Sequence, residues 1–396
     1  MKGGSRGIAC LMTSERLRKR FLQPSFRKDL PRASNAGADP VQSQRNMRFL
    51  IVKPSSLGDI LHAFPAVEAL RKAYPGAVID WVVNPAFAGL LDYMPGIDRR
   101  ILFRRKELGK WNTFFSEFFS LWKEIRKNSY DAVIDLQGLM RSALVARLAK
   151  APEYYGPGHV KENLAKLCYS KKLSYPPDVF HAVERNCEMI RQIPGVAEAD
   201  PYFGLPVLPE QKEKAEKLLA AEGFTRKSDA SWIAVAPGAR WVTKQWPPEF
   251  FAEVMRGIAE KRSRVSFLLL GSPAEKELAE KVKESLGNGI EVLDLCGKTD
   301  LGELVELIRM TDLLICNDSG PMHIAAAAGT RVLAFFGPTY PELTGPYCKI
   351  KRVFQPKLDC IKCFRKYCQN TLCHRSISTG EVVDSALELT GRSKNS

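Results

Sequence analysis

Residues 313–339, LLICNDSGPMHIAAAAGTRVLAFFGPT, combine the residue types and spacing of an anion-binding site. An apolar strand over 313–316 ends in short polar residues and a glycine, and a small-residue helix over 322–328 is predicted to follow. Such a corner points free backbone N–H groups and the positive end of a helix dipole at one place, where a phosphate binds. His323 stands about one turn into the helix and can lean toward the same place. An ordinary N-capped turn uses the same residue types, so the corner alone leaves both interpretations open.

A second strand end carries an acid. The run KPSSLGD over 53–59 leaves a predicted strand, turns through proline and glycine, and starts a helix at Asp59. A lone aspartate there is commonly a helix N-terminal acid, which the dipole stabilises. The alternative is a carboxylate that acts as a general base. Only an independent signal separates the two interpretations.

Several familiar catalytic motifs are absent from the sequence. No G-x-G-x-x-G follows a strand, which argues against a dinucleotide-binding dehydrogenase. The GKT at 297–299 lacks the upstream glycine of a P-loop, because Val292 stands at that position. No HExxH zinc motif occurs either.

Alternating strands and helices predict an α/β fold of two halves with parallel sheets. The predicted strands cover 48–53, 78–83, 99–103 and 131–135, then 232–236, 265–270, 291–294, 312–316 and 331–336. The predicted helices cover 59–73, 85–92, 112–128 and 138–150, then 211–223, 247–261, 273–286, 301–310 and 320–328. Residues 192–209 hold four prolines and are predicted to join the halves. Two such domains place their strand ends around a central cleft.

Length and charge divide the chain further. The 396 residues are too many for one ordinary core, and the net charge of +15 indicates an acidic partner. We expect a disordered basic extension over 1–46, with Met47 as an alternative start. Two Rossmann-like domains are predicted over 47–205 and 206–350, followed by a Cys-rich tail over 351–396 whose final helix crosses back onto the first domain.

The motifs together resemble glycosyltransferase family 9, the ADP-heptose:lipopolysaccharide heptosyltransferases. The resemblance covers about residues 47–350, and its motifs are long. They are KPSSLGDILHAFPAVEALR (53–71), IDWVVNP (79–85), DLQGLMRSAL (135–144), HAVER (181–185), NDSGPMHIAAAAGT and FFGPT. The resemblance implies a GT-B fold, with the acceptor on the first domain and the nucleotide-sugar on the second. It also implies inverting, metal-independent transfer of the first heptose to the Kdo sugars of lipid A.

Roles follow from the resemblance where the motifs match. Asp59 matches the general base that takes the acceptor hydroxyl proton. The donor-binding positions are Lys244, Glu275, Asp318, Ser319, Gly320 and His323. The acceptor-binding positions are Ser56, Gln137, Arg141, His181 and Arg185. Taken alone, Lys244 is also typical of a solvated surface lysine, and Glu275 of an acid in the first turn of a helix.

The implied chemistry suits these residues. The leaving ADP gains negative charge on its β-phosphate in the transition state. The sequence has no D-x-D cluster to hold a metal there. The helix N-terminus at Ser319 and Gly320, with the Lys244 ammonium, is predicted to stabilise that charge instead. We therefore expect no catalytic cofactor.

The implied partners are ADP-heptose and the acidic Kdo–lipid A acceptor at the inner leaflet of the inner membrane. We expect a cytoplasmic monomer that does not bind nucleic acid. The segment WNTFFSEFFSLW over 111–122 raises the question of membrane contact. Its stripe of Trp111, Phe115, Phe118, Trp122 and Ile125 indicates core packing. The alternative is an amphipathic face that rests on the membrane beside Lys106, Lys110 and Lys123.

Four cysteines cluster in the tail as C-x2-C-x4-C-x4-C. They are Cys360, Cys363, Cys368 and Cys373. A C-x2-C pair followed by further cysteines is a metal-ligand pattern, so a structural zinc is one hypothesis. Free thiols or a redox disulfide are the other. The resemblance to the family implies that this tail takes no part in the transfer chemistry.

Rival functions remain to be weighed. A nucleic-acid-binding protein would use the basic tails and the Cys cluster, but it leaves the two α/β cores unexplained. Nearer rivals are a GT-B enzyme with another nucleotide-sugar or acceptor, such as the second heptose or a later core sugar, and a GT-B-like epimerase.

Overall fold

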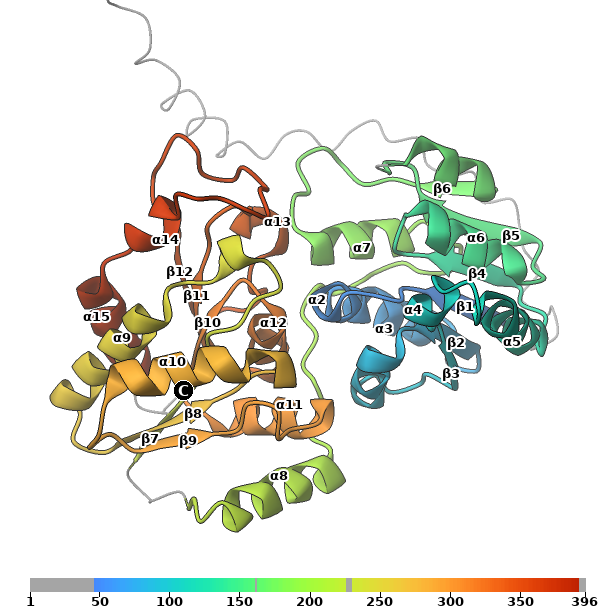
Figure 1. Cartoon of the computed structure of the whole chain (residues 1–396). Helices are drawn as coiled ribbons and strands as arrows, with labels where there is room; N and C mark the ends of the chain where they lie inside the picture. The colour runs from blue at the N-terminus through green and yellow to red at the C-terminus, as the bar shows by residue number, and fades with distance from the viewer. Residues whose placement is uncertain (1–45, 161, 226–229, 392–396) are drawn as a thin grey trace, which may run out of the picture. The chain divides into compact units, whose positions relative to one another are not determined.

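The computed structural model describes residues 46–160, 162–225 and 230–391, in which two parallel six-stranded sheets follow one another along the chain (Figure 1). The first sheet has the order β3-β2-β1-β4-β5-β6. Its strands are β1 (Arg48–Val52), β2 (Val78–Val83), β3 (Arg99–Leu102), β4 (Ala132–Asp135), β5 (Glu153–Pro157) and β6 (Lys171–Leu173). The central strands β1 and β4 are short apolar runs, as expected of strands buried on both faces.

The second sheet has the order β12-β11-β10-β7-β8-β9 and is also parallel throughout its pairs. Its strands are β7 (Ser231–Ala236), β8 (Val265–Leu269), β9 (Val292–Asp294), β10 (Leu313–Asn317), β11 (Arg331–Phe335) and β12 (Lys351–Phe354). All carboxyl ends of such a sheet meet at one edge. Loops far apart in sequence are therefore neighbours there.

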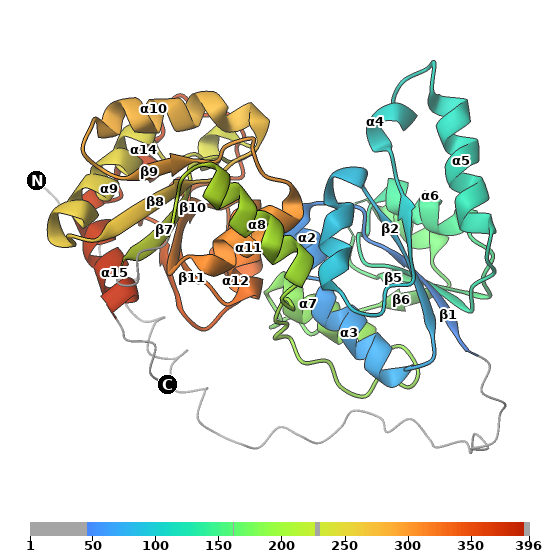
Figure 2. The ribbon, with the colours of Figure 1, turned by 90° about the horizontal axis from the view of Figure 1, so that it is seen from below.

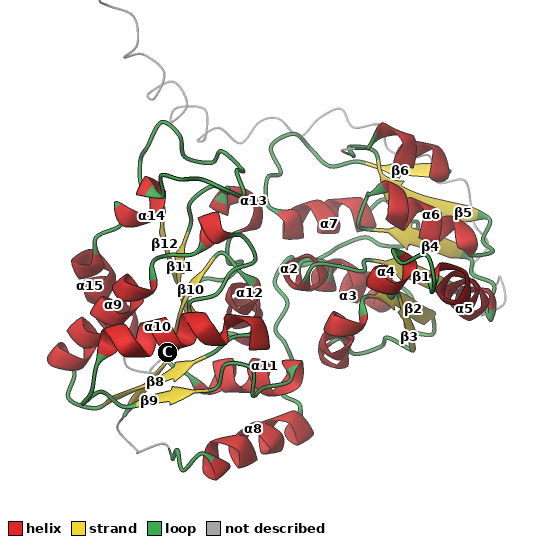
Figure 3. Ribbon diagram, in the orientation of Figure 1, coloured by secondary structure: helices red, strands yellow, loops and turns green. Residues whose placement is uncertain are grey.

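Helices cover both faces of each sheet (Figure 3). Those of the first half are α2 (Leu57–Leu61), α3 (Phe64–Ala73), η1 (Pro85–Tyr93), α4 (Arg105–Leu108), α5 (Phe114–Arg126), α6 (Met140–Leu148), η2 (Asn163–Cys168) and α7 (Ala182–Ile190). Those of the second half are α8 (Pro209–Ala221), η3 (Val242–Lys244), α9 (Pro248–Lys261), η4 (Pro273–Glu275), α10 (Lys276–Leu286), α11 (Leu301–Met310), α12 (Gly320–Ala328), α13 (Pro341–Thr344), α14 (Leu372–Arg375) and α15 (Thr379–Gly391).

Most predicted elements are confirmed, and the differences occur where local sequence signals are weak. Strands β5, β6 and β12 were not predicted, because they lie at or next to sheet edges and carry Lys, Gly and Pro. The helix predicted over 59–73 is two helices. Pro65 is the second residue of α3, and its missing N–H prevents α2 from continuing into α3.

Buried side chains fill the space between sheets and helices. One apolar cluster joins side chains of both halves, among them Trp81, Ile134 and Leu314. Trp246 is fully buried in a separate cluster under α9 and α15, where its indole N–H donates to the carbonyl of His374 at 2.9 Å. Buried indoles need such partners, since an unpaired donor inside a core is costly.

The aromatic stripe of α5 corrects a prediction. Of the five stripe residues expected in the core, only Ile125 is fully buried, and Phe118 is half-buried. Trp111, Phe115 and Trp122 are exposed. The helix is amphipathic as predicted, but its short apolar face of Leu121 and Ile125 meets the sheet, and the aromatic face does not.

The final helix does not cross back onto the first domain as predicted. Helix α15 packs on α9 and β10 of the second half, where Val382, Val383 and Ala386 are buried, rather than on the first domain.

Residues 191–208 form neither helix nor strand, as predicted for the link between halves. The basic extension lies outside the described residues except for Asn46. In the described part of the chain, no helix is long and apolar enough to cross a bilayer.

Candidate active site

Helix α2 of the first half lies directly against helix α12 of the second (Figure 2). Both helices begin with glycine-containing turns that permit this approach. A Cβ on Gly58 would collide with the ring of His323, and a Cβ on Gly320 would press on Leu57. The two strand-end motifs found in the sequence are therefore parts of one site.

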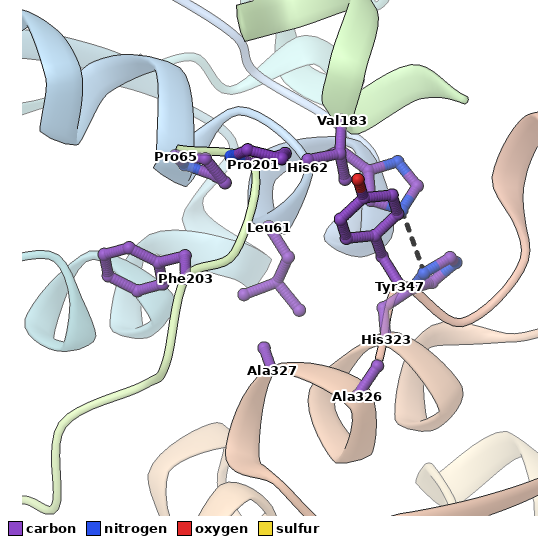
Figure 4. A pocket seen from close by; sticks show the side chains of 10 residues that line it. All are labelled: Leu61, His62, Pro65, Val183, Pro201, Phe203, His323, Ala326, Ala327 and Tyr347. Atoms are coloured by element: carbon purple, nitrogen blue, oxygen red, sulfur yellow. Dashed lines mark hydrogen bonds between the residues drawn. The ribbon is translucent and has the colours of Figure 1, made fainter. Parts of the chain in front are cut away.

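A pair of histidines joins the two helices. The Nε2 of His62 and the Nδ1 of His323 are 3.1 Å apart, and the rings stand nearly perpendicular (Figure 4). Burial lowers the pKa of His62 well below its usual value and that of His323 to about 4, although Asp318 and Asp59 pull the latter upward. Both rings are thus neutral at pH 7, so one donates and the other accepts.

His181 extends this contact to a third segment. It caps α7, accepting from the N–H of Val183 at 3.2 Å, and its Nε2 lies 3.0 Å from the carbonyl oxygen of Gly345. Its ring centroid is 5.3 Å from that of His62. Burial lowers the pKa of His181 as well. A small cavity of about 30 Å³ next to the pair is lined by His62, His323, Val183 and Tyr347, among others, and has room for about one water molecule (Figure 4).

Asp59 is held by its own turn. Its Oδ2 accepts hydrogen bonds from the backbone N–H and the hydroxyl of Ser56, both at 2.8 Å. Both bonds end on the same oxygen, and the carboxylate is half-buried. The sequence left two interpretations of Asp59, a helix-capping acid and a carboxylate at the cleft. The two are compatible here, because the capping hydrogen bonds hold the carboxylate at the α2–α12 contact.

A lysine that the sequence did not single out accompanies Asp59. Lys53 is 6% exposed, and its ammonium donates to the carbonyl of Leu136 at 2.6 Å. Burial lowers its pKa, while the carboxylates of Asp59 and Asp135 oppose that change. Asp135 is itself buried and accepts from Ser142 and Tyr169, so it is part of the structural frame.

The predicted acceptor positions Gln137, Arg141 and Arg185 have different surroundings. Gln137 follows β4, and its side-chain oxygen lies 3.4 Å from the N–H of Ser55, next to the Asp59 turn. Arg141 is exposed at the start of α6. Arg185 donates to the carbonyl of Val179 at 3.1 Å, and its guanidinium lies over the Tyr175 ring, 4.8 Å from the ring centroid.

The predicted donor corner centres on Asp318, which is 6% exposed. Its Oδ2 meets the Lys244 ammonium at 2.6 Å and accepts from the Thr339 hydroxyl at 2.6 Å. Lys244 also lies over the Trp241 ring, 4.9 Å from its centroid. The lysine predicted to meet phosphate is therefore held at the corner by an ion pair, beside the N-terminus of α12.

Ser319 and Asn317 shape the same corner. Ser319 is the N-cap of α12, and its hydroxyl oxygen is buried with no hydrogen-bond partner among the described residues. Asn317 is fully buried and bridges two loops, accepting from the N–H of Trp246 at 3.0 Å and donating to Pro237 at 2.7 Å. An unpaired buried hydroxyl at a helix N-terminus is a feature expected where an anion binds.

Glu275 lies in η4, in the loop after strand β8, which pairs with β7. Its Oε2 accepts from the N–H and hydroxyl of Ser272 at 2.6 and 2.8 Å, as a capping acid does. Its other oxygen lies so close to Gly238 that no side chain fits there. Glu275 is therefore part of the same sheet edge as Lys244 and Asp318, although its carboxylate is already bound to its own turn.

The tail packs on the loop that carries Lys244. The Thr243 hydroxyl donates to the carbonyl of Arg365 at 2.7 Å, and His374 Nε2 lies 2.8 Å from the carbonyl of Thr243. His374 is fully buried, and burial lowers its pKa. The tail thus supports the donor corner, a role that the cysteine spacing did not reveal.

The four cysteines of the predicted zinc site lie near one another in the tail. Cys360, Cys363, Cys368 and Cys373 are free thiols that line one cavity of about 340 Å³. In the described segments, no three side chains of His, Cys, Asp or Glu converge closely enough to hold one ion. A structural zinc bound by these cysteines therefore stays a prediction.

Sequence reasoning missed Lys53, His62 and Thr339. Lys53 follows a predicted strand, where a lysine is usually solvated. His62 lies beside core residues on the predicted helix, so its spacing suggested no other role. Only the packing of two halves reveals that His62 meets His323. Thr339 lay within the quoted FFGPT motif, and its position in the loop after β11 was the available signal.

Together these groups place a carboxylate of the first half and a lysine-bearing anion corner of the second half at one contact. The first can take a proton from a hydroxyl, and the second can bind a phosphate group. That combination is suited to group transfer from a phosphate-activated donor to an alcohol.

Known proteins are consistent with this geometry. The family model described as glycosyltransferase family 9 (heptosyltransferase) matches residues 118–374. A lipopolysaccharide heptosyltransferase 1 of Pseudomonas aeruginosa is 31% identical over 330 residues, covering 81% of this chain and 87% of the relative. A lipooligosaccharide heptosyltransferase 2 of Haemophilus influenzae is 29% identical, covering 76% and 86%. The structure of E. coli heptosyltransferase WaaC with ADP aligns with a TM-score of 0.68 at 27% identity, covering 87% and 100%.

Proposed function

Because this chain belongs to glycosyltransferase family 9, the heptosyltransferases, and has their GT-B fold, we propose that it moves heptose from ADP-heptose to the Kdo region of lipid A. The coarse activity, heptose transfer in lipopolysaccharide core synthesis, follows from the family. The donor is proposed because similar solved structures hold ADP and, in one case, ADP-2-deoxy-2-fluoro heptose.

The observation that carries the proposal is the contact between α2 and α12. It brings the Asp59 turn to the corner that holds Asp318, Lys244 and His323, and the Asp59 and Asp318 carboxylates both act on the pKa of His323. Neither motif alone specifies group transfer. A base on one half and an anion corner on the other provide both partners that the reaction needs.

Asp59 is proposed as the general base. Ser56 binds only Oδ2, and no hydrogen bond to Oδ1 occurs among the described residues, so Oδ1 is the oxygen that faces an acceptor hydroxyl. As the hydroxyl attacks the anomeric carbon, its proton passes to this carboxylate. Attack from the face opposite the leaving diphosphate inverts the anomeric configuration.

The leaving group is proposed to bind at the donor corner. Charge grows on the β-phosphate as the glycosidic bond breaks, and fixed donors stabilise it. Lys244 is the principal cation, shared between Asp318 and the phosphate. The unpaired Ser319 hydroxyl and the α12 N-terminus add hydrogen-bond donors. This set supports transfer without a metal ion, which we propose for this enzyme.

The acceptor is proposed as the first-heptose acceptor, and second-heptose transfer is the alternative. Relatives of both kinds match this chain with similar identity. Gln137 and Arg141 lie at the end of β4 and the start of α6, and Arg141 is exposed, as needed to meet a Kdo carboxylate. We propose that the enzyme works at the cytoplasmic face of the inner membrane.

One assay tests this proposal. Purified protein is given ADP-heptose with either Kdo2-lipid A or its singly heptosylated form, and product masses are measured. We expect one heptose to be added to Kdo2-lipid A, with ADP released, in the presence of a metal chelator. Addition only to the heptosylated acceptor would identify second-heptose transfer, and no addition to either would overturn the proposal.

A further inference from the structure

The helix pair α4–α5 carries large apolar side chains into solvent. Trp111 is 87% exposed, Phe115 and Phe119 are each 59% exposed, and Trp122 is 41% exposed. Phe115, Phe119 and Trp122 recur at helical spacing along α5, and Trp111 lies in the turn before it. These four residues are called the exposed stripe. Figure 2 shows α4 and α5 standing out at the margin of the first half.

The aromatic rings contact mainly one another. Phe114 stacks on Phe118 with centroids 5.9 Å apart, and Phe115 meets both Trp111 and Phe114 edge to face. The helix packs on the sheet through a different face, which carries Leu121 and Ile125. The exposed stripe is therefore not needed to hold α5 on the sheet. An exposed aromatic cluster of this kind indicates an interaction surface.

Basic residues surround the stripe. Segment 104–127 holds seven basic and three acidic side chains: Arg104, Arg105, Lys106, Lys110, Lys123, Arg126 and Lys127 against Glu107, Glu117 and Glu124. Lys110 and Lys127 pair with glutamates in the same segment. Within the described part of the chain, Arg105, Lys106 and Lys123 have no carboxylate at ion-pair distance, so their charge faces solvent.

We propose that α4 and α5 form a docking surface for an anionic lipid bilayer, into whose interface the aromatic stripe inserts. Trp and Phe favour the boundary between headgroups and acyl chains, and lysine side chains reach from there to lipid phosphates. A second copy of the chain would bring its own excess of positive charge to the same face. Charge complementarity therefore favours the bilayer over self-association.

This inference goes beyond the proposed activity and does not depend on it. The exposed stripe lies on α5 and the turn before it, and the proposed catalytic groups lie on α2, the η3 loop and α12. Loss of bilayer binding should leave reaction with an acceptor that lacks acyl chains unchanged. The two proposals can therefore fail separately.

Vesicle co-sedimentation of the full chain tests the inference. The probes are vesicles of phosphatidylethanolamine with phosphatidylglycerol, and vesicles of phosphatidylcholine alone. The variant carries Trp111→Ser, Phe115→Ser and Phe119→Ser. We expect binding to the anionic vesicles to fall roughly tenfold or more in the variant. Lys106→Gln with Lys123→Gln should weaken binding less and reduce its dependence on salt.

Control variants keep the test sharp. Val207→Ser with Ile350→Ser removes two other exposed apolar side chains, 51% and 52% exposed, and should leave vesicle binding unchanged. Circular dichroism and ADP-induced thermal shift confirm that each variant is folded. Unchanged anionic-vesicle binding in the folded triple variant would overturn the proposal. A second result would also overturn it: the wild-type enzyme binds no vesicles but forms a dimer, and the triple variant is monomeric.

Discussion

At the scale of single residues, the donor corner rests on an ion pair between Lys244 and Asp318. The pair is mostly shielded from water, with the lysine 18% and the aspartate 6% exposed. Removing one partner leaves the other charge poorly compensated, which costs more than removing both. The same lysine is proposed to meet the leaving phosphate, so its two roles can be separated by mutation.

Lys244→Met is predicted to reduce both stability and ADP affinity. Among the described residues, the buried Asp318 carboxylate then keeps the Thr339 hydroxyl as its one side-chain partner, and we expect a loss of roughly 1–3 kcal/mol in unfolding free energy. The double variant Lys244→Met with Asp318→Asn should recover most of that stability but not ADP binding. Chemical denaturation and calorimetric titration with ADP measure the two effects. Full recovery of ADP binding in the double variant would contradict the role given to Lys244.

The histidine pair predicts a pH dependence. The folded-state pKa of His323 is about 4, below the ordinary value of 6.5, so between these values the unfolded chain binds more protons. Stability from this group is fully present above about pH 6.5 and is lost as pH falls toward 4. His62 acts in the same direction. Chemical denaturation of wild type and His323→Asn between pH 6.5 and 4 measures this effect. The unfolding free energy of the variant should fall less steeply with falling pH than that of wild type, and equal slopes would contradict the prediction.

At the scale of elements, the α2–α12 contact and the tail position the site. Gly58→Ala would push a methyl group into the His323 ring. We expect transfer to fall and the melting temperature to drop, while Gly380→Ala, at a position with ample space, serves as the control. Wild-type activity in Gly58→Ala would show that the close approach is not needed.

The tail yields a separate prediction. His374 is fully buried and binds the Thr243 carbonyl one residue before Lys244. His374→Ala should loosen that loop, destabilise the protein by roughly 1–3 kcal/mol and weaken ADP binding. Cys368→Ser, at an exposed thiol of the same tail, should change neither property. The comparison is made by denaturation and by titration with ADP.

The elements also show what a sequence can predict. Runs such as FLIV and LLIC identified the buried central strands, because continuous apolar runs are typical of parallel sheets. Edge strands such as β6, with the sequence KKL, have no such signal. The spacing of α5 predicted an amphipathic helix correctly. It could not predict which face the sheet covers, since that depends on the neighbouring elements.

At the scale of the whole molecule, the site exists only because two similar halves meet. Asp59 and Asp318 were each identified from their own strand ends, and the resemblance connected them. His62 and Lys53 could not be assigned in this way, because their roles arise from contacts between segments distant in sequence: His62 meets His323, and Lys53 donates to the Leu136 carbonyl. The division of labour between the halves is the central claim of the account.

Asp59→Asn tests that claim most directly, with turnover and ADP affinity measured on the same protein. Asp384→Asn, an exposed carboxylate on α15, is the matched control. We predict that turnover in Asp59→Asn falls by roughly 10²–10⁴-fold, the range expected for a general base, while ADP affinity and stability stay close to wild type. Retained turnover, or ADP binding lost together with turnover, would contradict a base on one half and a donor site on the other.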